Sequence, residues 1–267
     1  MENVTYRSDD SHPLYATALG TGTPLLLLHG GGPDHRSLLP LARLLADGHR
    51  LLLPDIRGYG RSRCPDPALH TWARYGHDVV ALLDHLGLER AALLGTGLGG
   101  TIALRTAADH PTRVRAVIVA GLEDIEDDAG KAAETRMLEH FAARVRADGL
   151  AAAWSDVLPH LSPLIGALVH EAIPRADPQS VAAACALGYD RAFGHVTDLA
   201  AVTAPALIVP GADFRHPEAL AGAAVAVLPR GVLGPPVMTE EVRTAEELGT
   251  ALAPAVREFL GSLPERP

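Results

Sequence analysis

The stretch Ala91-Ala92-Leu93-Leu94-Gly95-Thr96-Gly97-Leu98-Gly99-Gly100 decides the fold of this chain. Its first four residues are apolar, as in a buried strand, and the glycines that follow are typical of a tight turn. A helical pattern then continues to about Ala108. The stretch therefore predicts a strand, a sharp turn centred on Gly97 and a helix that starts at Leu98.

Strands and helices alternate on both sides of this stretch. Further strands are predicted at the apolar runs 25–28, 51–53, 206–209 and 225–228, and at 114–120, where only Arg115 interrupts the run. Such runs indicate strands buried on both faces, which occur in parallel sheets covered by helices. We expect one helix over about 71–87 and a final helix that Pro254 kinks or restarts; the final helix carries Leu248, Leu252, Val256 and Phe259.

Residues 122–197 interrupt this rhythm of strands. Met137, Leu138, Phe141 and Val145 lie at helical spacing, and further alanine-rich helical segments follow. We therefore predict a helical cap over 122–197, inserted into a core that is formed by residues 1–121 and 198–267.

Composition limits the classes of partner. The net charge of −9 argues against nucleic acid, which favours a basic surface. No apolar run reaches the roughly 20 residues of a membrane helix, and the N-terminus shows no signal peptide. The two cysteines are far apart and the histidines form no metal-binding pair at helical spacing. We expect a cytoplasmic protein that acts on a small molecule without metal or cofactor, with the oligomeric state left open.

Three glycine-rich motifs carry a family resemblance. They are His29-Gly30-Gly31-Gly32-Pro33, Asp55-x-Arg57-Gly58-x-Gly60-x-Ser62 and Gly95-x-Gly97-x-Gly99-Gly100. In this order the chain resembles the α/β-hydrolase superfamily with a helical cap, over nearly its whole length. The third motif also contains the Gly-x-Gly-x-x-Gly string of dinucleotide-binding proteins, but it follows the third predicted strand and leaves the first motif unexplained.

The chain departs from the family at the catalytic triad. The family places a nucleophilic serine at the elbow between strand and helix, followed along the chain by an acid and a histidine. Gly97 stands at the elbow, the acid position falls on Phe214 with Asp213 one residue earlier, and no histidine follows His216. The resemblance therefore implies a divergent member without the Ser-Asp-His triad.

The resemblance also implies that an oxyanion hole is retained. It assigns the hole to the backbone N–H groups of Leu98 and of Gly31 or Gly30. A helix that begins at Leu98 adds positive potential there. Gly97 leaves room beside these donors, which can stabilise an enolate or a carboxylate as well as a tetrahedral oxyanion.

Several side chains are candidates for the remaining chemistry. Asp34 and His35 follow the first glycine motif, and Asp213 and His216 could form an acid–base pair beyond a strand end. Each pair also has a structural alternative, a capped surface turn for the first and a loop for the second. Trp154, Tyr189 and Arg191 could line a ligand site or simply pack the cap. We expect His29 to order the glycine loop and Cys64 and Cys185 to be inert thiols. A hydrogen bond between Asp55 and Arg57 is expected to fix the turn after their strand.

Three hypotheses of function follow. The first is a non-hydrolytic enzyme, of lyase, cyclase, isomerase or dehydratase type, that uses the oxyanion hole on a small organic molecule. The second is a non-catalytic binding or regulatory protein, and the third is a hydrolase that activates water with a base such as His35 or His216. Polar side chains above Gly97 would favour an enzyme. We expect a cavity of ~300–1,000 Å³ there, between cap and core.

Overall fold

An eight-stranded sheet forms the centre of the computed structural model, which describes residues 1–264. Its strands lie in the order β1-β2-β4-β3-β5-β6-β7-β8, and all neighbours from β4 to β8 are parallel. The strands are β1 (Glu2–Arg7), β2 (Pro13–Leu19), β3 (Thr23–Leu28), β4 (His49–Pro54), β5 (Ala91–Thr96), β6 (Val114–Ala120), β7 (Ala206–Val209) and β8 (Gly231–Leu233).

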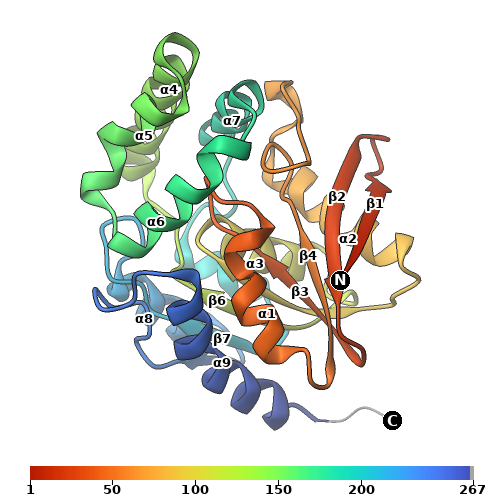
Figure 1. The fold of residues 1–267 in the computed structure, drawn as a ribbon. Coiled ribbons are helices and arrows are strands. Elements are labelled where there is room, and N and C mark those ends of the chain that lie inside the picture. The colour runs from red at the N-terminus through yellow and green to blue at the C-terminus, as the bar shows by residue number, and fades with distance from the viewer. Residues whose placement is uncertain (265–267) are drawn as a thin grey trace.

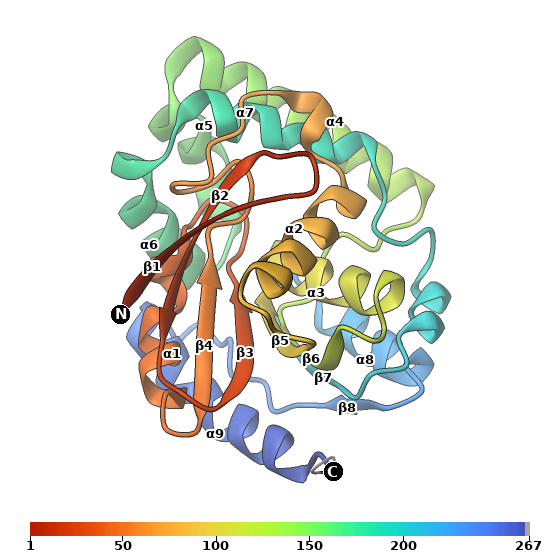
Figure 2. The ribbon, with the colours of Figure 1, turned by 90° about the vertical axis from the view of Figure 1, so that its right-hand side faces the viewer.

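Helices cover both faces of the sheet (Figures 1 and 2). One apolar core joins the sheet to α2 (Trp72–His85), α3 (Leu98–Asp109) and α8 (Glu218–Val227). A second core joins the other face to α1 (Leu39–Leu45) and α9 (Ala245–Ser262). The predicted architecture, a mostly parallel sheet with helices on both faces, is confirmed.

Four helices lie between β6 and β7 and stand together at one end of the sheet, in green in Figure 1. They are α4 (Asp128–Asp148), α5 (Leu150–Val157), α6 (Pro163–Ala172) and α7 (Pro178–Ala184). Three of them share a small apolar core of their own around Phe141 and Val145. The boundaries of the cap at 122 and 197 stay a prediction.

Three local predictions need correction. Residues 225–228 are the end of α8 and its C-cap, because a short apolar run fits a buried helix as well as a strand; the last strand is the short β8 instead. The antiparallel pair β1 and β2 was not predicted. Helix α9 runs without a break through Pro254, so the proline does not restart it.

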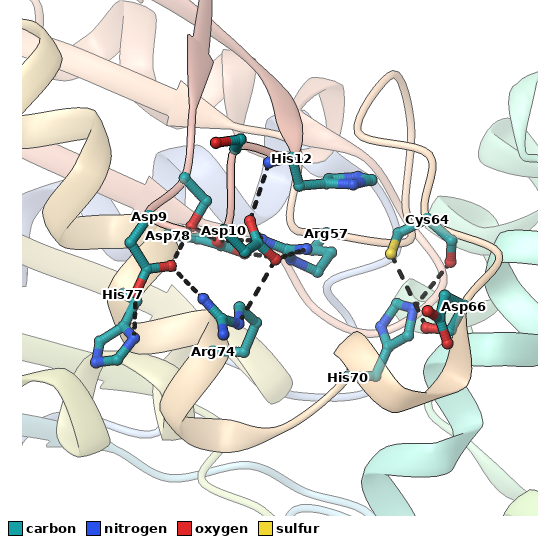
Figure 3. A network of polar contacts seen from close by, with 12 residues as sticks. Asp9, Asp10, His12, Arg57, Cys64, Asp66, His70, Arg74, His77 and Asp78 are labelled. Atoms are coloured by element: carbon teal, nitrogen blue, oxygen red, sulfur yellow. Dashed lines mark hydrogen bonds and ion pairs between the residues drawn. The ribbon is translucent and has the colours of Figure 1, made fainter.

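A buried polar network fixes the β1–β2 turn to the core (Figure 3). Arg57 donates to Asp78 of α2 at 2.8 and 2.7 Å and to Asp10 at 2.9 Å, and Ser8 donates to Asp78 at 2.5 Å. The expected Asp55–Arg57 bond is therefore wrong: the fork of Arg57 is turned toward α2 and the hairpin.

No helix within residues 1–264 combines the length and the apolar character that a membrane crossing requires.

Candidate active site

A cavity of about 170 Å³ lies between the glycine-rich loops and helices α4 to α6. This is smaller than the ~300–1,000 Å³ expected for small-molecule sites, so cap and core pack more closely than the sequence suggested. Its wall is mainly apolar, and its ionisable side chains near the elbow are Glu123, Arg215 and His216. The main apolar residues are Met137, Leu138, Phe141, Trp154, Leu161, Leu164, Ile165 and Leu168.

Gly97 forms the turn between β5 and α3 at the floor of this cavity. Its backbone has φ +50° and ψ −123°, which only glycine adopts without steric cost. The turn is held tightly against the sheet, since a Cβ on Gly99 would lie 2.2 Å from the carbonyl oxygen of Leu28. A Cβ on Gly97 would lie 2.8 Å from Glu123 Oε1 and 3.2 Å from His216 Nε2. Two polar side chains therefore face the space above the elbow.

His216 and Asp213, which were predicted as an acid–base pair, are hydrogen-bonded to each other in the loop after β7. His216 Nδ1 lies 2.7 Å from Asp213 Oδ1, which also accepts from the backbone N–H of Arg215 and His216. The other oxygen, Oδ2, accepts from the N–H of Ser162 at the start of α6, at 3.3 Å. Asp213 thereby fixes the imidazole with Nε2 toward Gly97.

The charges around this pair stabilise its ionised form. Burial alone would lower the pKa of His216, but the Glu123 and Asp213 carboxylates raise it above the ordinary histidine value. Burial alone would raise the pKa of Asp213, but its hydrogen bond from His216 holds it below its usual value. The imidazolium–carboxylate form of the pair is therefore more favoured than it would be for the two free side chains.

Glu123 is oriented by Arg215. Its Oε2 is shared by Arg215, at 3.1 Å, and by His216 Nε2, at 3.4 Å, while Oε1 is the oxygen nearest to Gly97. Arg215 Nη2 also reaches Asp124 at 2.8 Å and Glu134 of α4 at 3.1 Å, and Lys131 bonds to Glu134 at 2.8 Å. A single side chain therefore links the cap helix α4 to the carboxylate beside the elbow.

The carboxyl groups of this cluster do not all ionise together. Burial and the neighbouring Glu123 raise the pKa of Asp124 well above its ordinary value. Burial alone would raise the pKa of Glu134, but the hydrogen bond from Asp124 and the charges of Arg215 and Lys131 lower it. Within this coupled pair, Asp124 is therefore the carboxyl group that holds a proton more readily and Glu134 the one that ionises more readily.

The backbone donors expected for an oxyanion hole border the same cavity. Leu98 is the first residue of α3, so its N–H has no carbonyl partner within the helix. Gly30 and Gly31 line the cavity. His29 holds their loop in place, since its Nδ1 bonds to the Gly30 carbonyl at 2.8 Å and its Nε2 accepts from the N–H of Ile56 at 3.0 Å. This is the structural role expected for His29.

The sequence of the chain matches the profile of one protein family. The profile, described as "alpha/beta hydrolase fold", covers residues 23–162, just over half of the chain. The chain belongs to the α/β hydrolase fold family. Curated family members match it only in part: a 2-hydroxymuconate semialdehyde hydrolase of Pseudomonas sp. (strain CF600) is 37% identical over 108 residues, which is 38% of this chain and 37% of the relative. The curated relatives that the chain matches are covered over about a third to a half of their own length.

Two solved structures of the family align over the whole chain. A thermophilic esterase from Thermogutta terrifontis, with malate bound, is 25% identical, with a TM-score of 0.81 over 98% of this chain and 99% of its own. The bottromycin epimerase BotH, in complex with bottromycin A2, is also 25% identical, with a TM-score of 0.74 over 99% of this chain and 100% of its own. The fold thus occurs in proteins named for different reactions.

Asp34 and His35 do not line the cavity above Gly97. The two residues are buried, but Asp34 bonds to Arg36 at 2.7 Å and Arg175 at 3.0 Å, and His35 Nδ1 bonds to Asp55 at 2.7 Å. Neither side chain is among those that line the cavity. The prediction that they are catalytic is therefore corrected. The loop after Pro33 turns into the protein, where Asp34 accepts from Arg36 and Arg175 and His35 donates from Nδ1 to Asp55.

The cap residues divide in the same way. Trp154 lines the cavity, and a Cβ on Gly32 would lie 2.6 Å from its ring. Tyr189 is 70% exposed and bonds to Glu139, while Arg191 bonds to Asp128 at 2.7 Å. Tyr189 and Arg191 do not line the cavity, because polar partners on the outer side of α4 hold them there.

Glu123 and Arg215 are the site residues that sequence reasoning missed. Glu123 follows β6 by three residues, so its place beyond the carboxyl end of a parallel strand could have marked it. Arg215 stands between Asp213 and His216 and could have been grouped with them. Cys185 also lines the cavity, but burial raises its pKa to about 12, which fits the inert thiol that was expected.

Proposed function

We propose that this chain is a non-hydrolytic enzyme of the α/β-hydrolase fold that transfers protons on a small carbonyl compound, in a reaction of isomerase, lyase, cyclase or dehydratase type. The observation that carries the proposal is the pair of groups above Gly97. Glu123 Oε1 and His216 Nε2 lie 2.8 and 3.2 Å from the place where an elbow side chain would begin. A carboxyl group and an imidazole thus lie beside the elbow position, where other family members carry the nucleophilic serine.

Each group has a defined part in such a reaction. A carboxylate at Glu123 can remove a proton from the carbon beside a carbonyl, and the imidazolium of His216 can return one. The N–H groups of Leu98 and Gly31 would stabilise the enolate that forms between these steps. Asp213 keeps the imidazole oriented, and Arg215 keeps Glu123 Oε1 toward the cavity.

The absence of a side chain on Gly97 argues against a covalent route. No acyl group can form on glycine, and a serine there would crowd Glu123. Full-length structural relatives at 25% identity include an epimerase as well as an esterase, so proton transfer is compatible with this fold. The apolar wall of the cavity favours a small, mainly apolar substrate.

The test is hydrogen exchange in D₂O, followed by NMR on a panel of small ketones, esters and thioesters. We expect the protein to speed loss of the C–H signal beside the carbonyl for at least one compound. His216→Gln and Glu123→Gln should each lower that rate by about 100-fold or more. His140→Gln, which changes an exposed histidine of α4, is the matched control and should leave the rate unchanged.

Two results would overturn the proposal. An acyl-enzyme detected by mass spectrometry after incubation with p-nitrophenyl acetate would show covalent catalysis. Saturable ligand binding without exchange in any compound would instead support a binding protein.

A second candidate is hydrolysis by water that the His216–Asp213 pair activates, since this pair faces the cavity. In H₂¹⁸O, this route would label the acid product in a single turnover and leave the protein unmodified. Proton transfer alone would give no labelled acid.

A further inference from the structure

A second hollow, of about 340 Å³, is lined by arginines. Its walls are Arg36, Gly60, Arg61, Arg63 and Arg175. No acidic side chain is among these lining residues, although the chain as a whole has a net charge of −9. Four arginines thus line one small hollow in an acidic protein.

The local positive charge is only partly neutralised. Asp34 is the carboxylate that serves this group, and its Oδ2 is shared by Arg36 at 2.7 Å and Arg175 at 3.0 Å. Asp34 is only 3% exposed and lies behind the arginines. Within residues 1–264, no ion pair is formed by Arg61 or Arg63. A second buried carboxylate, Asp55, accepts from the backbone N–H of Arg61 at 2.8 Å. Four arginines against these two carboxylates leave positive charge in excess in the hollow.

Several of these arginines are held in place before any ligand arrives. Arg36 and Arg175 are fixed by Asp34, and the guanidinium of Arg61 lies 4.5 Å from the centre of the Tyr15 ring. Stacking on an aromatic ring orients a guanidinium without neutralising it. These side chains therefore have little conformational freedom left to lose when a ligand binds, and this favours affinity.

The hollow stands next to the cavity. Gly60 and Arg36 line the hollow, while their chain neighbours Tyr59 and Ser37 line the cavity. Arg175 follows helix α6 of the cap region, so both the core and the cap region contribute to the hollow. A ligand group held here lies just outside the space that the proton-transfer proposal uses.

We propose that this hollow is a binding site for a phosphate-type dianion, such as a phosphate ester or a diphosphate. Planar guanidinium groups bind phosphate oxygens in paired hydrogen bonds, and several of them are needed to balance a charge of two. The proposal rests on the arginine geometry alone and is independent of the reaction at Gly97.

The test is calorimetric titration with inorganic phosphate, pyrophosphate and glycerol phosphate at constant ionic strength. We expect saturable binding of one pyrophosphate per chain. The double variant Arg61→Gln/Arg63→Gln should weaken it about tenfold or more, since charged hydrogen bonds are lost. Both residues are exposed, so the variant should keep its melting temperature, which is measured alongside. Glycerol phosphate binding at least as tightly as phosphate would identify an ester as the ligand class.

The matched control is Arg230→Gln. Arg230 is exposed and lies before β8 at the opposite end of the sheet, in a hollow with Arg90, Arg115 and the acidic Glu89. It should change pyrophosphate binding by less than about twofold, because its loss removes only long-range charge. Equal losses in the control and the double variant, or no saturable binding of any of the three anions, would overturn the proposal.

Discussion

Two arginine clusters in this protein look alike but occupy different regions. Arg57 faces Asp78 and Asp10 within the core, and its side chain is fully enclosed. Arg215 faces Glu123, Asp124 and Glu134 and is 18% exposed. The partners of Arg57 belong to the β1–β2 turn and α2, whereas those of Arg215 come from the loop after β6 and from α4.

The difference lies in what each cluster leaves free. Both oxygens of Asp78 are occupied by Arg57 and Ser8, so that carboxylate has nothing left for a ligand. Arg215 and His216 take Oε2 of Glu123, and Oε1 remains toward the elbow. A cluster of ionised side chains thus points to chemistry only when one of its members reaches a cavity.

Loss of Arg57 should have the largest effect on stability. Arg57→Gln leaves Asp78 and Asp10 without their cation, which costs about 3–5 kcal/mol for a buried pair. Urea unfolding measures this change. Arg74→Gln, which removes a partly exposed partner of Asp9, is the control and should cost less than about 1 kcal/mol. A similar small cost for both variants would remove the structural role assigned to Arg57.

Loss of Arg215 should lower the rate of hydrogen exchange at the carbon beside a carbonyl group. Arg215→Gln frees Glu123, and we expect the exchange rate to fall about tenfold or more through misplacement of the base. Arg215→Lys keeps the charge but not the planar fork, so it should restore the rate only in part. Arg191→Gln also breaks a bond to α4, yet it touches neither Glu123 nor His216 and should leave the rate unchanged.

If the exchange rate of Arg215→Gln equals that of the wild type while His216→Gln abolishes exchange, Arg215 has a structural role only, as Arg57 does. The contrast with Arg57 would then disappear, although the proton-transfer proposal itself would stand.

A serine at the elbow tests the backbone beneath the Arg215 cluster. Gly97→Ser should cost about 1–3 kcal/mol, because φ at this position is +50°. It should not create esterase activity, since Glu123 and His216 occupy the space in front of it. Thermal unfolding measures the cost. Gly166→Ser in α6 has open space around the new Cβ and no positive φ, so its melting temperature should change less. Equal melting temperatures for the two variants would contradict strain at the elbow.

The smallest expected effect is a pH dependence of stability above pH 6 that comes from His216, the chain neighbour of Arg215. Because the pKa of His216 is raised in the folded state, its stabilising contribution is complete below the unfolded value of about 6.5 and is lost as the pH rises through the folded value. The stability difference between the wild type and His216→Gln should therefore shrink from pH 6 toward pH 9. Each tenfold difference in proton affinity corresponds to about 1.4 kcal/mol. A difference that grows with pH would contradict this sign.

The sequence predicts the parallel strands β3 to β7, because each of them is a mainly apolar run, but it misses the three-residue parallel strand β8. It does not predict β1, in which buried and exposed residues alternate, or β2, in which Tyr15 and Thr17 interrupt the apolar residues. Residues 225–228 show the converse error, since four apolar residues fit the end of α8 equally well.

The site is predicted in part, for a physical reason. Asp213 and His216 lie three residues apart in one loop, so local spacing suffices to pair them. Glu123 and Arg215 meet only because two parallel strands end side by side, which is a tertiary contact. Asp34 and His35 show the limit of chain position: they follow the glycine loop, yet the fold turns them inward to Arg36, Arg175 and Asp55.

The place of Trp154 against Gly32 makes the protein its own optical probe. The chain has two tryptophans, and the other, Trp72, is buried in α2 with an indole N–H that has no hydrogen-bond partner within residues 1–264. Trp72→Phe therefore removes no hydrogen bond and leaves Trp154 as the single emitter. Its fluorescence, excited at the red edge of the absorption band where the five tyrosines do not absorb, then reports directly on the cavity, so that ligand entry and movement of α5 can be followed in real time.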